Sequence, residues 1–354
     1  MTLVPPSPVP TVYLIDGSGF IFRAFHALPP LKSPAGVPVG AVYGFCNILL
    51  RFLEKLNHDH LHDYLGVVFD AGRQTFRQKI YADYKAHRPE APEELVPQFA
   101  LIREACQVLG VPFMEAAGYE ADDLIASYAE MAKQQGYKVV IVSSDKDLMQ
   151  LVDDHVSLLD PLKNRPIGPS EVFEKFGVTP DKVIEVQALM GDSSDNVPGV
   201  PGIGPKTAAE LIQHFGTLEQ LLMHTHTIKQ VKRRESLQQH ADKARLSKQL
   251  VTLVKDVPLP LSFDQLRPQV PHTQACQDFF QQHGFHSLLN RFKTENVQKA
   301  AGQSYEMVTT MGQLASWQRL ISQSTMVAID TETTSLNIQK AQLVGISLAV
   351  VNAL

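Results

Sequence analysis

The chain has 354 residues, 44% of them hydrophobic and 19% charged, and a formal net charge of −5. This length and composition predict two globular domains, or one large domain with an appendage. No apolar run approaches the ~18 residues of a membrane span, and the Pro-rich residues 1–10 lack the pattern of a secretory signal, so we expect no membrane contact and a disordered tail. Three scattered cysteines exclude a cysteine zinc site and predict a cytoplasmic protein. The acidic balance argues only weakly against a nucleic-acid partner, because a total charge averages over local patches.

Three short β-branched apolar runs have the composition of strands that are buried on both faces of a parallel sheet. They are TVYLID (11–16), YLGVVFD (64–70) and KVVIVSSD (138–145). Helical patterns alternate with them, at residues 42–56, 96–109 and 121–135. This alternation predicts an α/β fold with a mostly parallel central sheet flanked by helices.

Each of the three runs ends in an aspartate, namely Asp16, Asp70 and Asp145, and Asp147 follows the last of them. After a single strand, an aspartate is usually a turn residue or a helix N-cap. Ligands of parallel sheets bind at the edge where the carboxyl ends of the strands meet. Three strands that end alike therefore favour a shared site at that edge.

The helix expected at residues 121–135 begins with three more carboxylates, Glu120, Asp122 and Asp123. One interpretation is that they only complement the helix dipole, at about 0.3–1 kcal/mol each. The helix follows a strand-like stretch, VPFMEA (111–116), so its N-terminus can face the same sheet edge. The second interpretation, which we favour, is that these carboxylates belong to the shared site.

Residues 165–220 follow the order helix, Gly/Pro-rich loop, helix. Gly202 and Gly204 form a tight turn whose backbone N–H groups can bind a phosphate at the start of the second helix, and Lys206 adds a positive charge. A G-x-G pattern alone is weak, but between two helices it predicts a helix-hairpin-helix element, which holds a DNA backbone without reading its sequence.

Two aspartates after the first of these helices complete a set of nine candidate metal ligands. The nine are Asp16, Asp70, Glu120, Asp122, Asp123, Asp145, Asp147, Asp192 and Asp195. Carboxylates packed together cannot all stay ionised without cations, and an oxygen-only set favours Mg²⁺ or Mn²⁺. Two such ions would activate a water and stabilise the leaving oxygen of a phosphodiester. We expect two or three of the nine to be caps or supporting groups instead.

A basic stretch precedes the second half of the predicted core. Its cations are Arg73, Arg77, Lys79, Lys85 and Arg88. Tyr81 and Tyr84 lie between them, as a stacking surface for nucleic-acid bases requires. The alternative is an ordinary solvated basic helix, which the neighbouring carboxylates make less attractive.

Five motifs resemble the 5′ nuclease domain of bacterial DNA polymerase I, which is similar to the flap endonucleases. They are LIDGSGFIFRAFHALPP, YADYKAHRPEAPEEL, GYEADDLIASYA, SSDKDLMQLV and MGDSSDNVPGVPGIGPKTAAELI. The resemblance covers residues 11–292. It implies a PIN-like nuclease core with a helical arch at 11–165, a helix-hairpin-helix DNA-binding subdomain at 166–292 and a linker at 293–303.

The resemblance also implies roles for these residues. The nine carboxylates would hold two metal ions. Tyr84, Lys85 and Arg88 match the arch through which the 5′ strand passes, with Lys85 and Arg88 as catalytic contacts to the scissile phosphate. Gly202, Gly204 and Lys206 would hold the downstream duplex, and we expect Arg73 and Arg77 to contact DNA as well.

A second, partial resemblance concerns residues 304–354. MVAIDTETTSL matches the first motif of a 3′–5′ exonuclease domain of ribonuclease H-like fold, with Asp330 and Glu332 as its metal ligands. The other exonuclease motifs and the polymerase domain are absent from this chain. We therefore expect an incomplete second site.

Together the patterns and the resemblance predict a monomeric, Mg²⁺-dependent, structure-specific 5′–3′ exonuclease and flap endonuclease. The resemblance implies that its substrates are flapped, nicked or 5′-ended DNA and primer RNA, in repair and Okazaki fragment processing. One alternative is a metal-free clamp for flapped DNA, against which the carboxylates argue because they would weaken DNA binding. Another is an aspartyl phosphatase, which requires a D-x-D pattern after the first strand, whereas Gly17 and Ser18 follow Asp16.

Overall fold

The computed structural model describes residues 9–57, 63–161, 163–269, 271–291, 306–324, 326–335 and 340–350. The chain forms two compact units, Met1–Thr294 and Glu295–Leu354. The predicted linker at 293–303 and most of the predicted disordered tail lie outside the described residues. None of the helices in the described segments is long and apolar enough to cross a membrane.

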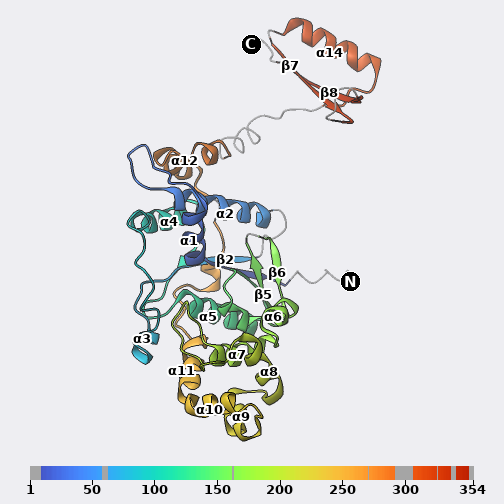
Figure 1. The fold of residues 1–354 in the computed structure, drawn as a ribbon. Helices are drawn as coiled ribbons and strands as arrows, with labels where there is room; N and C mark the ends of the chain where they lie inside the picture. Colours follow the sequence, from blue (N-terminus) through green and yellow to red (C-terminus); the bar gives the residue numbers. More distant parts are fainter. Residues whose placement is uncertain are drawn as a thin grey trace, which may run out of the picture. The chain divides into compact units, whose positions relative to one another are not determined.

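A six-stranded sheet is the centre of the first unit (Figure 1). Its spatial order is β3-β2-β1-β4-β5-β6. The strands are β1 (Thr11–Asp16), β2 (Tyr64–Val68), β3 (Phe113–Met114), β4 (Lys138–Val142), β5 (Val156–Asp160) and β6 (Arg165–Ile167). Only β6 runs antiparallel to its neighbour, so the predicted mostly parallel sheet is confirmed. The two short outer strands β5 and β6 were not anticipated from the sequence.

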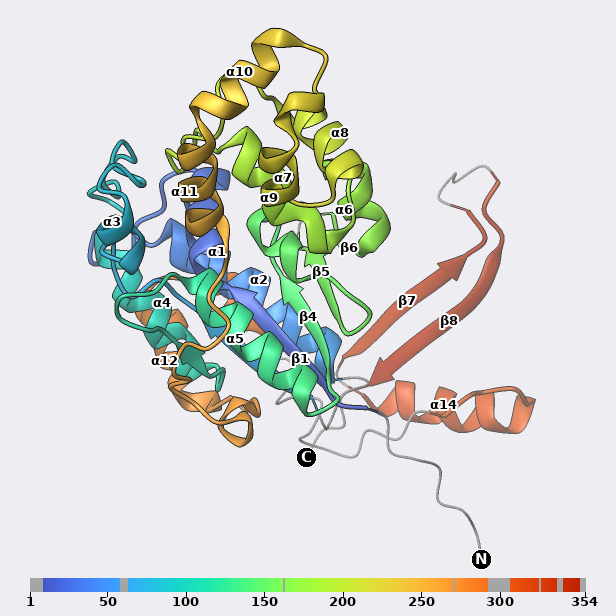
Figure 2. The same cartoon turned by 90° about the horizontal axis from the view of Figure 1, so that it is seen from below.

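Side chains alternate between the two faces of the sheet along each strand. Both faces carry apolar residues here, and helices cover both of them. Ile15 of β1 packs into a core with α1 (Gly17–Ala27), α2 (Gly40–Asn57) and α4 (Val96–Val108). Its neighbour Leu14 packs on the opposite side, with α5 (Ala121–Gln134). Figure 2 shows α5 crossing the sheet in front of β1 and β4, with α2 behind them.

A helical half follows the sheet, at one end of the unit (Figure 1). It contains α6 (Pro169–Phe176), α7 (Val183–Met190), α8 (Pro205–Phe215), α9 (Leu218–Met223), α10 (Val231–Gln239) and α11 (Ala241–Val251). Short 3₁₀ turns occur at η1 (Asp147–Leu151), η2 (Pro180–Lys182), η3 (Thr225–Thr227) and η4 (Phe263–Leu266). The loop at 191–204 joins α7 to α8, and α11 packs back against α7.

The last part of the first unit corrects the expected boundary of the second subdomain, which was 166–292. Leu266 of η4 packs in the α5-side core, and α12 (Thr273–Gln282) buries Cys276 and Phe280 in the core with α2 and α4. The chain therefore returns to the α/β core after α11. The sequence of residues 256–291 does not reveal this return, because an apolar helix face does not show which part of the core it packs against.

The second unit contains α14 (Met311–Gln323) and a two-stranded antiparallel sheet of β7 (Val327–Thr333) and β8 (Leu343–Val350). Both strands were expected, near 327–330 and 343–351, whereas α14 was not. None of the residues of α14 is buried, and every described residue of both strands is exposed or half-buried. The described part of this unit therefore has no hydrophobic core of its own.

Candidate active site

The carboxylates that follow the parallel strands gather at one edge of the sheet, as expected. Asp16 ends β1 and caps α1, because its Oδ1 accepts the Gly19 N–H at 2.8 Å. Its Oδ2 accepts the Ser143 hydroxyl at 2.8 Å. Asp70, after β2, accepts the Ala121 N–H at 2.8 Å, which ties the start of α5 to the same edge. The helix-cap interpretation and the shared-site interpretation are thus compatible.

Burial, together with neighbouring acids, raises the pKa of Asp16 and of Asp122. Burial raises the pKa of Asp16 to about 6, and the nearby Asp145 and Asp70 add to the shift. Burial, then Asp145 and Asp16, raise the pKa of Asp122 well above its ordinary value. Desolvated carboxylates that repel each other favour protons or cations. The electrostatics of this edge are therefore those of a cation site.

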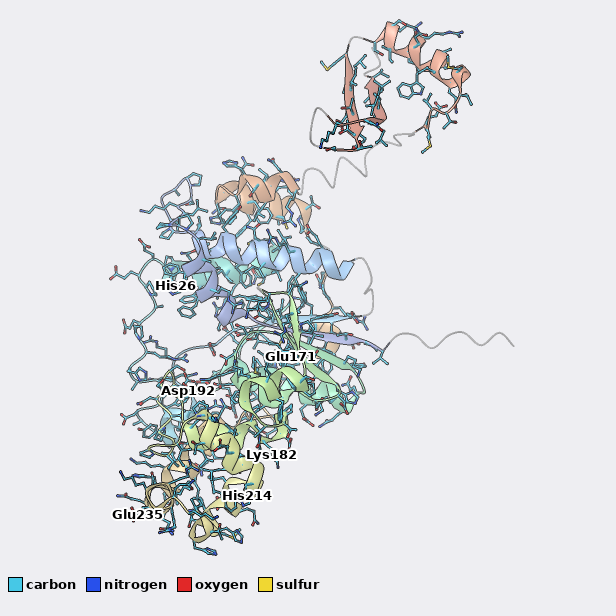
Figure 3. The ribbon with its side chains drawn as sticks, turned by 45° about the vertical axis from the view of Figure 1, so that its right-hand side comes forward. His26, Glu171, Lys182, Asp192, His214 and Glu235 are labelled. Carbon is cyan, nitrogen blue, oxygen red and sulfur yellow. The ribbon has the colours of Figure 1, made fainter. Side chains whose placement is uncertain are left out.

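The loop after α7 brings Asp192 and Asp195 to this edge, where Asp147 of η1 also lies. Burial and Asp145 raise the pKa of Asp147 to about 7, and Asp195 raises it further. Asp192 behaves differently: burial raises its pKa, but hydrogen bonds from Lys146 and Ser194 outweigh that effect and lower it. Figure 3 labels Asp192, which lies where the helical half meets the α/β core.

Cations from the basic stretch lie directly on these carboxylates. Lys85 Nζ is 2.8 Å from Glu120 Oε1 and 3.4 Å from Asp195 Oδ2, and Arg88 pairs with Asp195 Oδ1. Lys85 adopts a left-handed backbone with φ 55°, and its N–H donates to the Asp195 carbonyl at 2.9 Å. A non-glycine residue in this region is strained, which is common at functional sites.

Because basic side chains already pair with some of these acids, the fit of the site to divalent ions has to be examined. Among the described residues, no three acidic, histidine or cysteine side chains form a ready-made metal cage. Lys85, Arg88 and Lys146 neutralise Glu120, Asp195 and Asp192 instead. Five of the acids still line one pocket together with Tyr84, namely Glu120, Asp122, Asp147, Asp192 and Asp195. The donor set contains oxygen alone and carries an excess of negative charge, so it fits hard dications.

Asp123 and Arg77 need a correction. Asp123 was expected to bind metal and Arg77 to contact DNA, but Asp123 is fully buried and Arg77 is only 1% exposed. Their side chains form a bidentate ion pair with N–O distances of 2.6 and 2.7 Å. Both oxygens of Asp123 also accept backbone N–H groups, so neither is free for a metal ion.

The remaining basic stretch also departs from expectation. Its helix, α3 (Phe76–Ile80), is short, and turns rather than a long arch helix follow it. Tyr84 was expected to stack on bases, but it is 3% exposed and its hydroxyl donates to Glu120 Oε2 at 3.2 Å and to Asp195 Oδ2 at 3.3 Å. In this state Tyr84 supports the carboxylates. Arg73, in contrast, is exposed and contacts the Pro89 carbonyl.

The glycine turn before α8 lies open on the surface of the helical half. Gly202 has φ +79°, which favours glycine, and Gly204 is the N-cap of α8. A Cβ at either glycine would meet nothing within 4 Å, so a ligand can approach this backbone closely. Pro205 begins the helix as expected, and Lys206 is exposed beside it.

Lys146 and Gln187 are among the residues that contact the acidic cluster and that the sequence reasoning missed. Lys146 pairs with Asp192 at 2.5 Å. It lies between Asp145 and Asp147, so its position in the chain could have identified it. Gln187 is 1% exposed, and its amide donates to Asp147 Oδ1. Its Oε1 is buried with no partner among the described residues. Gln187 gives no sequence signal, because it lies within an apolar helix.

Two family models match most of the first unit. The model described as "5'-3' exonuclease, N-terminal resolvase-like domain" matches residues 11–177, and "5'-3' exonuclease, C-terminal SAM fold" matches residues 178–274. The chain belongs to the 5′–3′ exonuclease family. The resemblance inferred from the motifs is therefore confirmed.

Curated relatives of this family include both short and long proteins. A 5′–3′ exonuclease of Aquifex aeolicus is 41% identical over 279 residues, which cover 79% of this chain and 94% of the relative. DNA polymerase I of Rhizobium leguminosarum is 53% identical over 259 residues, which cover 72% of this chain but 26% of the relative. The chain thus matches about a quarter of that polymerase, and other DNA polymerase I relatives are covered by about a third to two-fifths.

Solved structures of nucleases share the fold. Zinc-bound T5 5′-exonuclease superposes with a TM-score of 0.56 at 24% identity and covers 81% of this chain and 98% of its own. The catalytic core of Rad2 in complex with DNA substrate superposes with a TM-score of 0.54 at 16% identity, covering 80% of this chain and 91% of its own. These likenesses confirm the PIN-like sheet flanked by helices.

Proposed function

We propose that this chain is a divalent-metal-dependent, structure-specific 5′ nuclease that hydrolyses phosphodiesters in flapped, nicked or 5′-ended DNA and in primer RNA. The observation that carries the proposal is the edge where buried, mutually repelling carboxylates meet Lys85 and Arg88. Acids alone would repel a nucleic-acid backbone. Acids that hold cations, with basic side chains beside them, can bind and cleave it.

Two Mg²⁺ or Mn²⁺ ions are the proposed cofactors. The residues proposed to hold them are Asp16, Asp70, Glu120, Asp122, Asp145, Asp147, Asp192 and Asp195. When bound, such ions supply Lewis acidity that activates a water and stabilises the leaving oxygen. Divalent ions are present in the fold neighbour titled as zinc-bound T5 5′-exonuclease, which supports metal use without fixing its identity.

Lys85 and Arg88 are the proposed catalytic cations. In the structure their charges lie on Glu120 and Asp195. If these carboxylates held metal ions, Lys85 and Arg88 would lose their present partners and would be free to contact the scissile phosphate. They would then stabilise the negative charge that develops on the phosphate in the transition state.

The glycine turn of the helical half is the proposed grip on the downstream duplex. Gly202 and Gly204 present backbone N–H groups on an open surface, and Lys206 adds an exposed charge. Arg73 offers a further exposed cation in residues 73–88, the basic stretch around α3, which we call the arch segment. Fold neighbours are described as complexes with DNA, including a T5 flap endonuclease and the Rad2 core, which supports this assignment.

We further propose a cytoplasmic, monomeric enzyme that acts in DNA repair and in the removal of primers from Okazaki fragments. The family membership and the DNA polymerase I relatives support this role. The aspartyl phosphatase alternative is not favoured, because it leaves the open glycine turn and the pairing of Lys85 and Arg88 without a purpose.

One experiment tests the proposal directly. The chain is incubated with a 5′-labelled flap, a nicked duplex and single-stranded DNA, with Mg²⁺ or with a chelator, and the products are sized. We expect metal-dependent cleavage at the flap junction. Asp70→Ala or Asp145→Ala should abolish cleavage by more than ~100-fold while flap binding stays within about threefold, because each removes a proposed metal ligand.

The matched control is Asp154→Ala, which removes an exposed carboxylate just before β5, at the opposite edge of the sheet. It should leave cleavage unchanged. Equal losses of binding and cleavage in a folded Asp70 or Asp145 variant would contradict a direct metal role. Cleavage that survives in chelator would overturn the proposed function.

A further inference from the structure

A buried ion pair links the arch segment to the first turn of α5. Arg77 is 1% exposed and Asp123 is fully buried. Arg77 Nη1 donates to Asp123 Oδ2 at 2.6 Å, and Nη2 donates to Oδ1 at 2.7 Å. This planar two-bond contact fixes both the distance and the orientation of the two side chains.

The same guanidinium holds the end of the helical half. Its Nε donates to the Leu250 carbonyl at 2.8 Å, and Nη2 donates to the Thr252 carbonyl at 3.2 Å. On the other side of the pair, Asp123 Oδ1 accepts the Val254 N–H at 3.0 Å. The pair therefore clamps the chain where it leaves α11, and α11 packs on α7, the helix that precedes the loop carrying Asp192 and Asp195.

Asp123 also fixes the carboxylates at the start of α5. Its Oδ2 accepts the Glu120 N–H at 3.1 Å, which holds the N-cap of α5. The next N–H, that of Ala121, donates to Asp70 at 2.8 Å. This buried pair thus connects three parts of the chain: the arch segment, which carries Arg77, the acidic first turn of α5, and the residues that follow α11. Figures 1 and 2 both show α3 near α11.

We propose that Arg77 and Asp123 are positioning residues. They fix the position of the helical half, which would hold the duplex, relative to the carboxylate site, and so determine which phosphodiester is cut. This inference rests on the proposed function. A structure-specific nuclease selects its bond by the offset between the duplex contacts and the catalytic groups. In this structure, the Arg77–Asp123 pair joins the C-terminal end of α11 to the first turn of α5.

The test compares Arg77→Lys and Asp123→Asn with the unaltered chain on a single-flap substrate, with products resolved to one nucleotide. Lysine keeps the charge but loses the planar fork, and asparagine keeps the shape but loses the charge. We expect one dominant product from the unaltered chain and products spread over neighbouring positions from both variants. The kcat should fall roughly tenfold or more while KM stays within about threefold, because small misplacements of reacting groups are costly.

Arg103→Lys is the matched control, because it makes the same change in an ion pair of α4 with Glu115, at 2.6 Å. It should leave the product distribution unchanged. Thermal melting defines the folded fraction of each variant, and Asp123→Asn alone carries the test if Arg77→Lys does not fold. Cleavage at the single unaltered position, with a rate reduced only in proportion to the folded fraction, would overturn the inference. Absence of any cleavage by the unaltered chain would instead refute the proposed function.

Discussion

Lys85 occupies the position of a counter-ion in the acidic pocket. Its ammonium group contacts both Glu120 and Asp195, and it is held there by a strained backbone with φ 55°. A cation that is present in the pocket must be displaced before a divalent ion can use the same carboxylates. The residue should therefore oppose metal binding and assist the chemical step.

We expect Lys85→Ala to slow single-turnover flap cleavage by about 100-fold, since one lost donor to a developing oxyanion costs about that much. The same variant should bind Mn²⁺ more tightly in calorimetry without DNA, because Glu120 and Asp195 lose a competing charge. Lys133→Ala, which removes a lysine paired with Asp153 on the far end of α5, is the control and should change neither quantity. Weaker Mn²⁺ binding by Lys85→Ala would contradict this account.

At the level of residues, the sequence predicted much of the acidic cluster but not its pairing. Asp16, Asp70 and Asp145 could be found because each follows an apolar strand, and strand ends share an edge. Asp123 could not be separated from Asp122 by any local rule, because its partner Arg77 lies 46 residues away. The burial of Tyr84 could not be predicted from the sequence either, because its hydroxyl contacts Glu120 at the start of α5 and Asp195 in the loop after α7.

The turn between α7 and α8 gives a prediction at the level of elements. Lys206→Ala should reduce the slope of log K against log salt for duplex binding by roughly one unit, because one fewer phosphate is neutralised. The kcat should change little, since Lys206 lies on α8, outside the acidic pocket. Lys138→Ala removes an exposed lysine from the amino end of β4 and should keep the full slope. An unchanged slope for Lys206→Ala would exclude this turn as a phosphate contact.

Helix α12 ends in a buried histidine that should make its docking sensitive to acid. His283 is 5% exposed, its ring lies 4.5 Å from that of Phe279, and neither ring nitrogen has a partner among the described residues. Burial lowers the pKa of His283, although Glu104 opposes the shift. The neutral ring is therefore favoured in the folded state. Stability is present above the ordinary histidine pKa and is lost as the pH falls through it, because the unfolded chain takes up the proton first.

Thermal melting between pH 7.5 and 5 tests this expectation in chelator. The melting temperature of the unaltered chain should fall more steeply with acid than that of His283→Phe, which preserves the aromatic packing with Phe279 and Phe285 but cannot titrate. The comparison removes the contribution of other titrating groups, since they are common to both proteins. Parallel melting curves would show that His283 does not couple α12 to pH.

The elements themselves were predictable where their pattern was strong. The long apolar periods gave α2, α4 and α5 to within two residues, and β1 was predicted with its observed bounds. The strand β5 was missed because VSLLD, although as long as β2 and β4, has a single β-branched residue, and β6 was missed because RPI is only three residues long and contains a proline. The return of α12 to the core was missed because its partners in α2 and α4 are more than 160 residues earlier in the chain.

At the level of the whole chain, the two units differ in what stabilises them. The first unit has a hydrophobic core on each face of its sheet. In the described part of the second unit, Ile329, Leu343 and Val344 are 66%, 59% and 68% exposed. A two-stranded sheet with exposed apolar residues is marginal in water and offers unpaired edges for aggregation. The second unit should therefore lower solubility.

Removing residues 295–354 tests this division and the meaning of Asp330 and Glu332. We expect flap cleavage within about twofold of the full chain, because every proposed metal ligand lies in the first unit, and higher solubility in a concentration series. We also expect the full chain to leave 3′ ends intact. Asp330 and Glu332 lie on one exposed strand, residues 333–354 contain no further acid, and a two-metal site needs more oxygen ligands than these. The control for that assay is Asp330→Ala in the full chain. A collapse of flap cleavage on deletion would mean that the second unit supports the nuclease, and degradation of a 3′ end that Asp330→Ala abolishes would mean that two acids on one strand suffice for a working site.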